Sequence, residues 1–239
     1  FNKNMVFLIS EIGVNWDGDF SLLEEMMKKS KEIGFDVVKF QAFLPAMVKE
    51  HPEFSRLVKS SVSSDNIDEI DRLSKEVGIE WFATPMYKGA VNLLNPFVNK
   101  FKIREFDGRE IVEGVTTEIF EEIKNTGKEI IVSSQKSPKN SKFYKDPKIK
   151  WLYCEPKYPC TFEGINFKEL DDFDGFSNHT PHFLAPLMAN ILGAGIIEIH
   201  ITSDKNKDFI DNNVSFDYNE AINLVSLINS SEKIIKNRK

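Results

Sequence analysis

Residues 173–202 read FDGFSNHTPHFLAPLMANILGAGIIEIHIT, and the type of fold is most readily inferred from this segment. It contains two short apolar runs, and a helix-sized segment that ends at Gly193 lies between them. A strand, a helix and a second strand in this order predict two neighbouring parallel strands. His179 and His200 stand at the ends of the two runs, so we expect both imidazoles at the same end of the sheet.

The same alternation of short apolar runs and amphipathic segments extends along the chain. Strands are expected at 5–10, 36–40, 79–83, 98–103, 129–133, 150–154, 173–177 and 195–201. Helices are expected at 21–33, 66–77, 87–95, 115–125, 183–192 and from 218 to between 228 and 235. Residues 134–149 carry lysines, two prolines and little apolar pattern, and predict a loop or a degenerate helix after the fifth strand.

Eight strand units in a chain of this length predict an α/β fold, a (β/α)8 TIM barrel that occupies residues 1–239 as a single domain. The main alternative is an open doubly wound sheet. That fold should carry a glycine-rich turn after its first strand, and Glu11-Ile-Gly-Val-Asn15 is not such a turn.

The composition excludes several classes of protein. Of the 239 residues, 41% are hydrophobic and 28% charged, which is typical of soluble globular proteins. The net charge of -6 disfavours nucleic acid as a partner, and no apolar run is long enough for a membrane span. The cysteines, Cys154 and Cys160, do not make a disulfide framework, so we expect a cytoplasmic protein and interpret both as small packing residues.

Polar side chains follow the predicted strands, and in a barrel the catalytic groups gather at these carboxyl ends. They are Glu11, Asn15, Lys39, Gln41, Thr84, Lys102, Ser133, Ser134, Tyr158, Ser177, His179, Glu198, His200 and, in the last loop, Asp211. Two lysines with several hydroxyls suit a phosphate ligand, and two histidines with carboxylates suit a divalent metal. Either histidine alone could instead be hydrogen-bonded without a metal.

Seven of these strand ends together resemble the sialic acid synthase family. The matching segments are Glu11-Ile-Gly-Val-Asn-Trp-Asp-Gly18, Val38-Lys-Phe-Gln41, Ala83-Thr-Pro85, Phe101-Lys-Ile103, Tyr158-Pro159, Gly175-Phe-Ser-Asn-His-Thr180 and Ile197-Glu-Ile-His-Ile-Thr202. They stand in the order of the family with nearly its spacing. Each is weak by itself, and the ordered set is specific.

The resemblance implies a barrel enzyme that condenses phosphoenolpyruvate with the open-chain aldehyde of an N-acylated amino sugar. The products are a nonulosonic, sialic-type acid and phosphate. A divalent metal, Mn with Mg or Co as alternatives, polarises the aldehyde in this family. The resemblance further implies a role for each matching residue: His179 and His200 as metal ligands; Lys39, Thr84, Lys102, Ser133 and Ser177 as the phosphoenolpyruvate cradle; Gln41, Tyr158 and Asp211 as sugar contacts; and Glu11 beside the metal and the reacting carbons.

The chain departs from the family pattern at several places. Arg104 and Glu105 follow Lys102-Ile103 where the family has a small residue and then Ser-Gly, so Arg104 either replaces a lost hydroxyl as a phosphate ligand or blocks the site. Pro156 stands where the family has Asn or Ser, and the loop at 44–65 is short. The family has a C-terminal antifreeze-like domain, and we expect residues 1–239 to form the barrel without it.

Three functions follow as hypotheses. The first is a phosphoenolpyruvate-dependent synthase whose partners are phosphoenolpyruvate, a sugar aldehyde and further copies of the chain in a homo-oligomer, with no nucleic acid and no membrane. The second is a non-catalytic member of the family that binds phosphate or metal within a sugar-biosynthesis assembly. The third is another metal-dependent barrel lyase or isomerase that uses the same two histidines.

Overall fold

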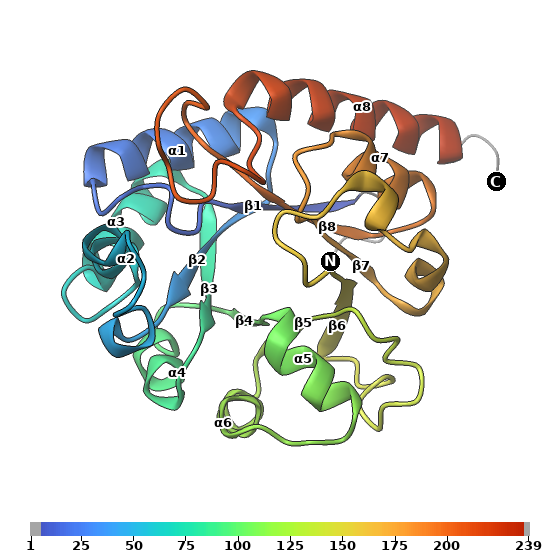
Figure 1. Cartoon of the computed structure of the whole chain (residues 1–239), viewed down its shortest axis with the longest axis horizontal. Helices are drawn as coiled ribbons and strands as arrows, with labels where there is room; N and C mark the ends of the chain where they lie inside the picture. Colours follow the sequence, from blue (N-terminus) through green and yellow to red (C-terminus); the bar gives the residue numbers. More distant parts are fainter. Residues whose placement is uncertain (1–5, 237–239) are drawn as a thin grey trace.

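A computed structural model describes residues 6–236, and within them eight parallel strands close into one barrel (Figure 1). Each strand pairs with the next in the sequence, and the last pairs with the first. The strands are β1 (Phe7–Glu11), β2 (Val37–Ala42), β3 (Glu80–Pro85), β4 (Lys100–Ile103), β5 (Glu129–Ser134), β6 (Ile149–Tyr153), β7 (Gly175–Ser177) and β8 (Ile196–His200). The predicted TIM barrel is confirmed. Met5, the expected start of the first strand, lies outside the described residues.

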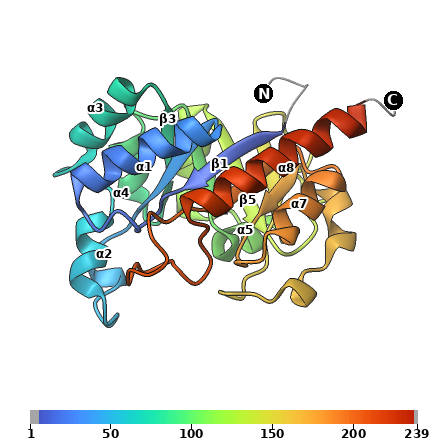
Figure 2. The same ribbon diagram turned by 90° about the horizontal axis from the view of Figure 1, so that it is seen from above.

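The strands are apolar nearly throughout because both of their faces are covered. One face looks into the barrel and the other packs under the surrounding helices (Figure 1). These are α1 (Phe20–Ile33), α2 (Phe54–Ser60), α3 (Ile67–Val77), α4 (Lys88–Leu94), α5 (Glu105–Val112), α6 (Glu118–Thr126), α7 (Leu184–Ile191) and α8 (Tyr218–Lys236). Figure 2 shows α1 and α8 side by side on one flank of the barrel. None of the helices in residues 6–236 combines the length and the apolar character that a bilayer crossing needs.

Capping residues determine where the predicted helix at 21–33 begins and ends. The side chain of Asp19 accepts hydrogen bonds from the backbone N–H groups of Ser21 and Leu22, and so caps α1. Gly34 ends the same helix at φ 106°, a left-handed conformation that favours glycine. These two signals explain why the expected helix at 21–33 and the observed α1 agree within one residue.

Two helices were not predicted. The expected loop at 44–65 contains α2 and the short 3-10 helix η1 (Pro45–Met47). The expected helix at 115–125 begins later, at Glu118, and the separate helix α5 precedes it directly after β4. The predicted loop after β5 is confirmed, since residues 135–148 contain no α-helix.

The connection between β6 and β7 is also irregular, and β7 is only three residues long. This connection holds two 3-10 helices, η2 (Phe162–Gly164) and η3 (Phe167–Asp172), in place of an α-helix. Gly175 begins β7 where the neighbouring strand comes very close. A Cβ atom at this position would lie 2.2 Å from the carbonyl oxygen of Ile196, so the pairing of β7 with β8 requires glycine here.

Candidate active site

Strand register brings the polar side chains together at the carboxyl mouth of the barrel. Glu11 stands beside Lys39 on one neighbouring strand and beside His200 on the other. Ser177 stands beside Glu198. Because alternate residues of a strand share a face, Glu198 and His200 both point into the barrel.

A pocket of about 260 Å³ opens at this mouth. All eleven residues singled out as site residues from the sequence line it: Glu11, Lys39, Gln41, Thr84, Lys102, Ser133, Tyr158, Ser177, His179, His200 and Asp211. The structure therefore brings every one of them to one place. Their individual roles stay predictions.

Two buried lysines and two buried carboxylates form the floor of the pocket. Lys39 Nζ lies 3.2 Å from Glu11 Oε2 and 3.4 Å from Glu198 Oε2. Lys102 Nζ lies 3.0 Å from Glu198 Oε1, which also accepts a 2.8 Å hydrogen bond from the hydroxyl of Ser177. All four charged side chains are at most 5% exposed. Burial at this level requires pairing, and each charge has a partner.

The charges hold one another in their ionised forms. Burial by itself would raise the pKa of Glu198, but Lys102 and Lys39 lower it well below its usual range. Burial would likewise lower the pKa of Lys39, and the carboxylates of Glu11 and Glu198 raise it above its ordinary value. Lys102 differs, because burial lowers its pKa by more than Glu198 raises it. The lysine donors in the floor of the pocket therefore have their positive charges offset by neighbouring carboxylates.

The two histidine rings lie next to each other in the pocket, with centroids 5.8 Å apart and ring planes inclined at 62°. The ring of Tyr158 lies against both, at 4.9 Å from His179 and 5.7 Å from His200. Nδ1 of His179 lies 2.8 Å from the carbonyl oxygen of Glu155. Since a carbonyl only accepts, this Nδ1 is the donor, and Nε2 keeps its lone pair when the ring is neutral. Burial lowers the pKa of His179 and so favours the neutral ring.

The pair of imidazoles fits a divalent metal ion. Nδ1 of His200 is buried and has no hydrogen-bond partner among the residues described; Asp211 Oδ2 is 3.7 Å away. Imidazole nitrogens suit Mn, Fe, Zn and similar ions, and a hydrogen bond on the other ring nitrogen orients such a ligand. Within residues 6–236, no group of three or more His, Cys, Asp and Glu side chains is placed to hold a metal. The chain would therefore supply two ligands and leave the other positions to water and substrate.

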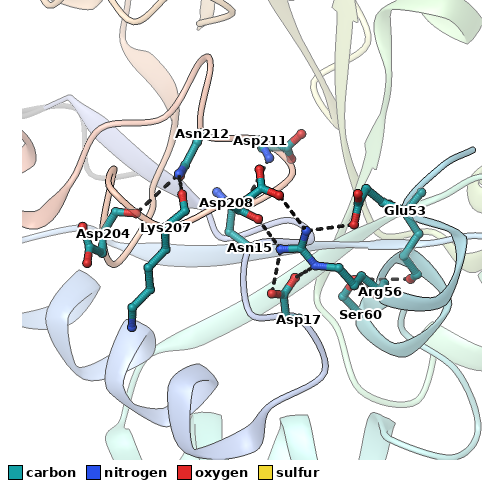
Figure 3. A network of polar contacts seen from close by, with 11 residues as sticks. Asn15, Asp17, Glu53, Arg56, Ser60, Asp204, Lys207, Asp208, Asp211 and Asn212 are labelled. Atoms are coloured by element: carbon teal, nitrogen blue, oxygen red, sulfur yellow. Dashed lines mark hydrogen bonds and ion pairs between the residues drawn. The ribbon is translucent and has the colours of Figure 1, made fainter.

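A separate network anchors the loop that carries Asp211, as Figure 3 shows. Asn15 accepts a 3.0 Å hydrogen bond from the backbone N–H of Asp211 and donates to the carbonyl oxygen of Ile201. Arg56 of α2 pairs with Asp17 through two nitrogens, at 2.9 and 3.3 Å, and also donates to the backbone oxygen of Asp208. One guanidinium thus joins the loop after β1, the loop after β2 and the loop after β8.

Five further residues line the pocket. Glu198 was expected at the strand ends without an assigned role, and Arg104 was expected either as a phosphate ligand or as a block. Met86, Glu105 and Cys154 were not expected to line it. Glu198 had a readable signal, since it stands two residues before His200 on the same strand face. The interpretation of Cys154 as a packing residue is incomplete. Its sulfur lies 3.6 Å from Nδ1 of His179, in the pocket wall. The other cysteine, Cys160, is buried and does not line the pocket.

Comparisons with known proteins identify relatives of the chain. The chain is 29% identical to an uncharacterised protein of Methanocaldococcus jannaschii, over 96% of the chain and 72% of that protein. It is 28% identical to the N,N'-diacetyllegionaminic acid synthase of Legionella pneumophila, over 96% of the chain and 73% of that enzyme.

A solved structure, that of the N-acetylneuraminic acid synthetase of Leptospira borgpetersenii, superposes with a TM-score of 0.82 at 24% identity. The match covers 97% of the chain and 85% of that structure, and it shows the shared barrel fold. The model of the NeuB family matches residues 26–239, which is most of the chain. The resemblance read from the seven strand-end segments is thereby confirmed, and the chain belongs to the NeuB family, whose named relatives here are sialic-type acid synthases.

Proposed function

We propose that the chain is a metal-assisted synthase that joins phosphoenolpyruvate to the aldehyde of an N-acylated amino sugar. The products are a nonulosonic acid and phosphate. One observation carries the proposal: paired lysines and two neighbouring imidazoles line a single pocket at the carboxyl mouth of the barrel. An anion site and a metal site so close together suit the joining of an anionic substrate to a carbonyl.

The lysine side of the pocket would bind phosphoenolpyruvate. Lys39 and Lys102 supply ammonium donors, and Thr84 Oγ1 lies 3.4 Å from Lys39 Nζ. The hydroxyl of Ser133 is buried and has no hydrogen-bond partner among the residues described. Buried polar groups are normally paired, so this hydroxyl is expected to pair with a bound ligand. Cations fixed before the reaction stabilise the charge that grows on the phosphate as it leaves.

The histidine side would hold the acceptor. His179 and His200 would bind a divalent ion, with Mn as the first candidate and Mg or Co as alternatives. Such an ion supplies a Lewis acid that polarises the aldehyde oxygen. Gln41 donates a 3.1 Å hydrogen bond to Glu11, which stands between Lys39 on one neighbouring strand and His200 on the other. Tyr158 and Asp211, which also line the pocket, would contact the sugar.

The proposed reaction forms one carbon–carbon bond, between C3 of phosphoenolpyruvate and the aldehyde carbon. Water then adds at C2, and the bond from C2 to the phosphate oxygen breaks, so the product keeps the three carbons of pyruvate. The acceptor is inferred from the N-acylated products named for relatives of the chain, the legionaminic acid synthase among them.

The test uses phosphoenolpyruvate labelled with carbon-13 at all three carbons, with Mn²⁺ and a panel of aldehydes. The panel holds N-acetylmannosamine, its 6-deoxy diamino analogues, arabinose 5-phosphate and unsubstituted sugars. Mass spectrometry should find a product that carries the three labelled carbons, and it should form best from an N-acylated amino sugar. Binding of phosphoenolpyruvate by calorimetry without any labelled product would instead support the non-catalytic member of the family. A product only from unsubstituted sugars would contradict the proposed acceptor.

A further inference from the structure

Helix α5 lies at the mouth of the barrel, next to the strand that carries Lys102. It begins immediately after β4, and Gly108 in its middle lies against the end of β5. A Cβ atom at Gly108 would be 1.9 Å from the carbonyl oxygen of Ser133, so only glycine allows this approach. The close packing fixes the start of α5 beside the pocket. Arg104, which directly precedes α5, and Glu105, the first residue of the helix, line the pocket.

Arg104 is held in place but keeps part of its guanidinium free. Its Nε donates to Asp107 Oδ2 at 2.7 Å, and its Nη1 lies 3.7 Å from the sulfur of Met86. Its central carbon stands 5.1 Å from the centre of the Phe106 ring. Nη2 has no hydrogen-bond or ion-pair partner within residues 6–236, and the side chain is 35% exposed. The arginine is therefore oriented by three neighbours and still has donors to give to a ligand.

The other cations of the pocket are already balanced. Lys39 is shared by Glu11 and Glu198, and Lys102 is paired with Glu198. A phosphate monoester brings about two negative charges at neutral pH. The floor alone gives such a group little net attraction. Arg104 is the third cationic side chain of the pocket wall, and its own carboxylate partner, Asp107, does not line the pocket.

Two further donors stand at the same end. The hydroxyl of Ser133 is 1% exposed, lines the pocket and lacks a hydrogen-bond partner among the residues described. In the first turn of α5, the backbone N–H of Asp107 donates to the carbonyl oxygen of Arg104, whereas those of Glu105 and Phe106 have no hydrogen-bond partner within residues 6–236. Such unpaired N–H groups at a helix start favour anions. The carboxylate of Glu105 could compete with a bound anion for these donors, but it forms an ion pair with Arg109 of the same helix.

We propose that Arg104 binds the phosphate group of a substrate, together with the hydroxyl of Ser133 and the first turn of α5. The inference rests on the proposed function, which supplies the phosphate. The planar fork of arginine matches phosphate oxygens in a way that a lysine does not. Two sources carry this group: phosphoenolpyruvate itself, or an acceptor aldehyde that is a sugar phosphate.

The variants Arg104→Ala and Arg104→Lys test the proposal against Arg72→Ala as a matched control. Arg72 also pairs with acidic side chains, Glu69 and Glu76, but on the exposed surface of α3. In Arg104→Ala we expect the KM for phosphoenolpyruvate to rise about 10- to 100-fold, the range of a lost charge-assisted hydrogen bond. Lysine should restore part of the loss, because it keeps the charge without the fork. The Arg72 variant should keep the wild-type value.

Kinetic measurements with the aldehydes show which substrate carries the phosphate group that Arg104 binds. If Arg104 holds phosphoenolpyruvate, the KM of every aldehyde stays within about twofold of wild type in Arg104→Ala. If it holds a sugar phosphate, the variant loses the preference for phosphorylated over unphosphorylated aldehydes and keeps its KM for phosphoenolpyruvate. Unchanged values for both substrates would overturn the proposal.

Calorimetry with inorganic phosphate distinguishes a failure of this inference from a failure of the proposed function. A wild-type chain that turns over no substrate but binds phosphate, with weaker binding in Arg104→Ala and partial rescue in Arg104→Lys, supports the site without the synthase. Equal phosphate binding in wild type and Arg104→Ala rejects the site, whether or not the enzyme is active. Thermal unfolding of each variant checks that it is folded under the conditions in which binding and activity are measured.

Discussion

Glu198 is the residue on which the charges of the pocket floor depend. Among residues 6–236 it is the single carboxylate paired with Lys102 and one of two paired with Lys39. Removing one partner of a buried ion pair leaves an uncompensated charge, which costs about 3–5 kcal/mol. In Glu198→Gln, Lys102 loses its carboxylate. In Lys102→Met, Glu198 keeps Lys39.

We therefore expect Glu198→Gln to lower the free energy of unfolding more than Lys102→Met does. The double variant should lose less stability than the sum of the two, because the charges that remain are again paired. Urea unfolding of the four proteins measures both effects. Equal losses from the single variants, or strictly additive losses, would show that Glu198 does not balance the floor.

The second prediction at the scale of residues concerns His179 and His200. Alanine at either position should lower the metal-dependent activity by more than about 100-fold, since even outer partners of metal ligands contribute 10- to 100-fold. Binding of Mn²⁺, followed by equilibrium dialysis, should fall in parallel.

His182→Ala is the matched control for the histidine variants. This histidine stacks on Phe162, with ring centroids 4.9 Å apart, and does not line the pocket. It should keep wild-type binding of Mn²⁺ and wild-type activity. Full activity in His179→Ala or His200→Ala would remove the metal assignment.

How far the site could be predicted differs from residue to residue. Lys39, Lys102 and His200 were readable because a polar residue at the end of an apolar strand has few other reasons to be there. Glu198 was expected at the same mouth, but its role as the partner of both lysines was not predicted, because the pairing depends on how distant strands meet in the closed barrel. The orientation of Arg104 was not readable at all. It depends on Asp107, on Met86 in the connection after β3 and on the packing of α5.

At the scale of elements, the loops above the barrel are held by Arg56. Its guanidinium contacts Asp17, Glu53 and Asp208, which lie in the connections after β1, β2 and β8 (Figure 3). Asp208 stands three residues before Asp211, on the acceptor side of the pocket. Arg56 is thus a positioning residue for that side.

In Arg56→Ala we expect the KM for the aldehyde to rise about five- to thirtyfold, the effect of losing 1–2 kcal/mol. The KM for phosphoenolpyruvate should change by less than about twofold, because the lysine side has no contact with Arg56. Hydrogen exchange in residues 203–217 should become faster. Arg72→Ala, which removes an exposed arginine with similar ion pairs, should change neither substrate. An equal rise in both KM values would mean that Arg56 stabilises the fold and does not position Asp211.

The elements themselves were predictable where periodicity was strong. The strands and the helix α1 followed their apolar patterns and their caps. The helix α5 was missed because residues 105–112 contain few apolar side chains, with Gly108 in the middle and Phe106 64% exposed. Its position comes from contact with β5, and a single sequence does not display such tertiary contacts. The helix α2 was missed because seven residues give too little periodicity.

At the scale of the whole molecule, barrel closure makes one site out of residues that are far apart in the sequence. β1 pairs with β8, so Glu11 and His200 become neighbours although 189 positions separate them in the chain. The lysine side and the histidine side then share one pocket. Under the proposed function, this pocket binds both substrates and catalyses the formation of a bond between them.

The measurement that tests this claim most directly is phosphate release from phosphoenolpyruvate by the wild-type chain with Mn²⁺, in the presence and absence of an N-acylated amino sugar. We expect release that depends on both the aldehyde and the metal, and that stops when EDTA is added. Release at the same rate without any aldehyde would show simple hydrolysis and contradict the claim. So would a complete lack of release across the aldehyde panel by protein that still binds phosphoenolpyruvate and Mn²⁺.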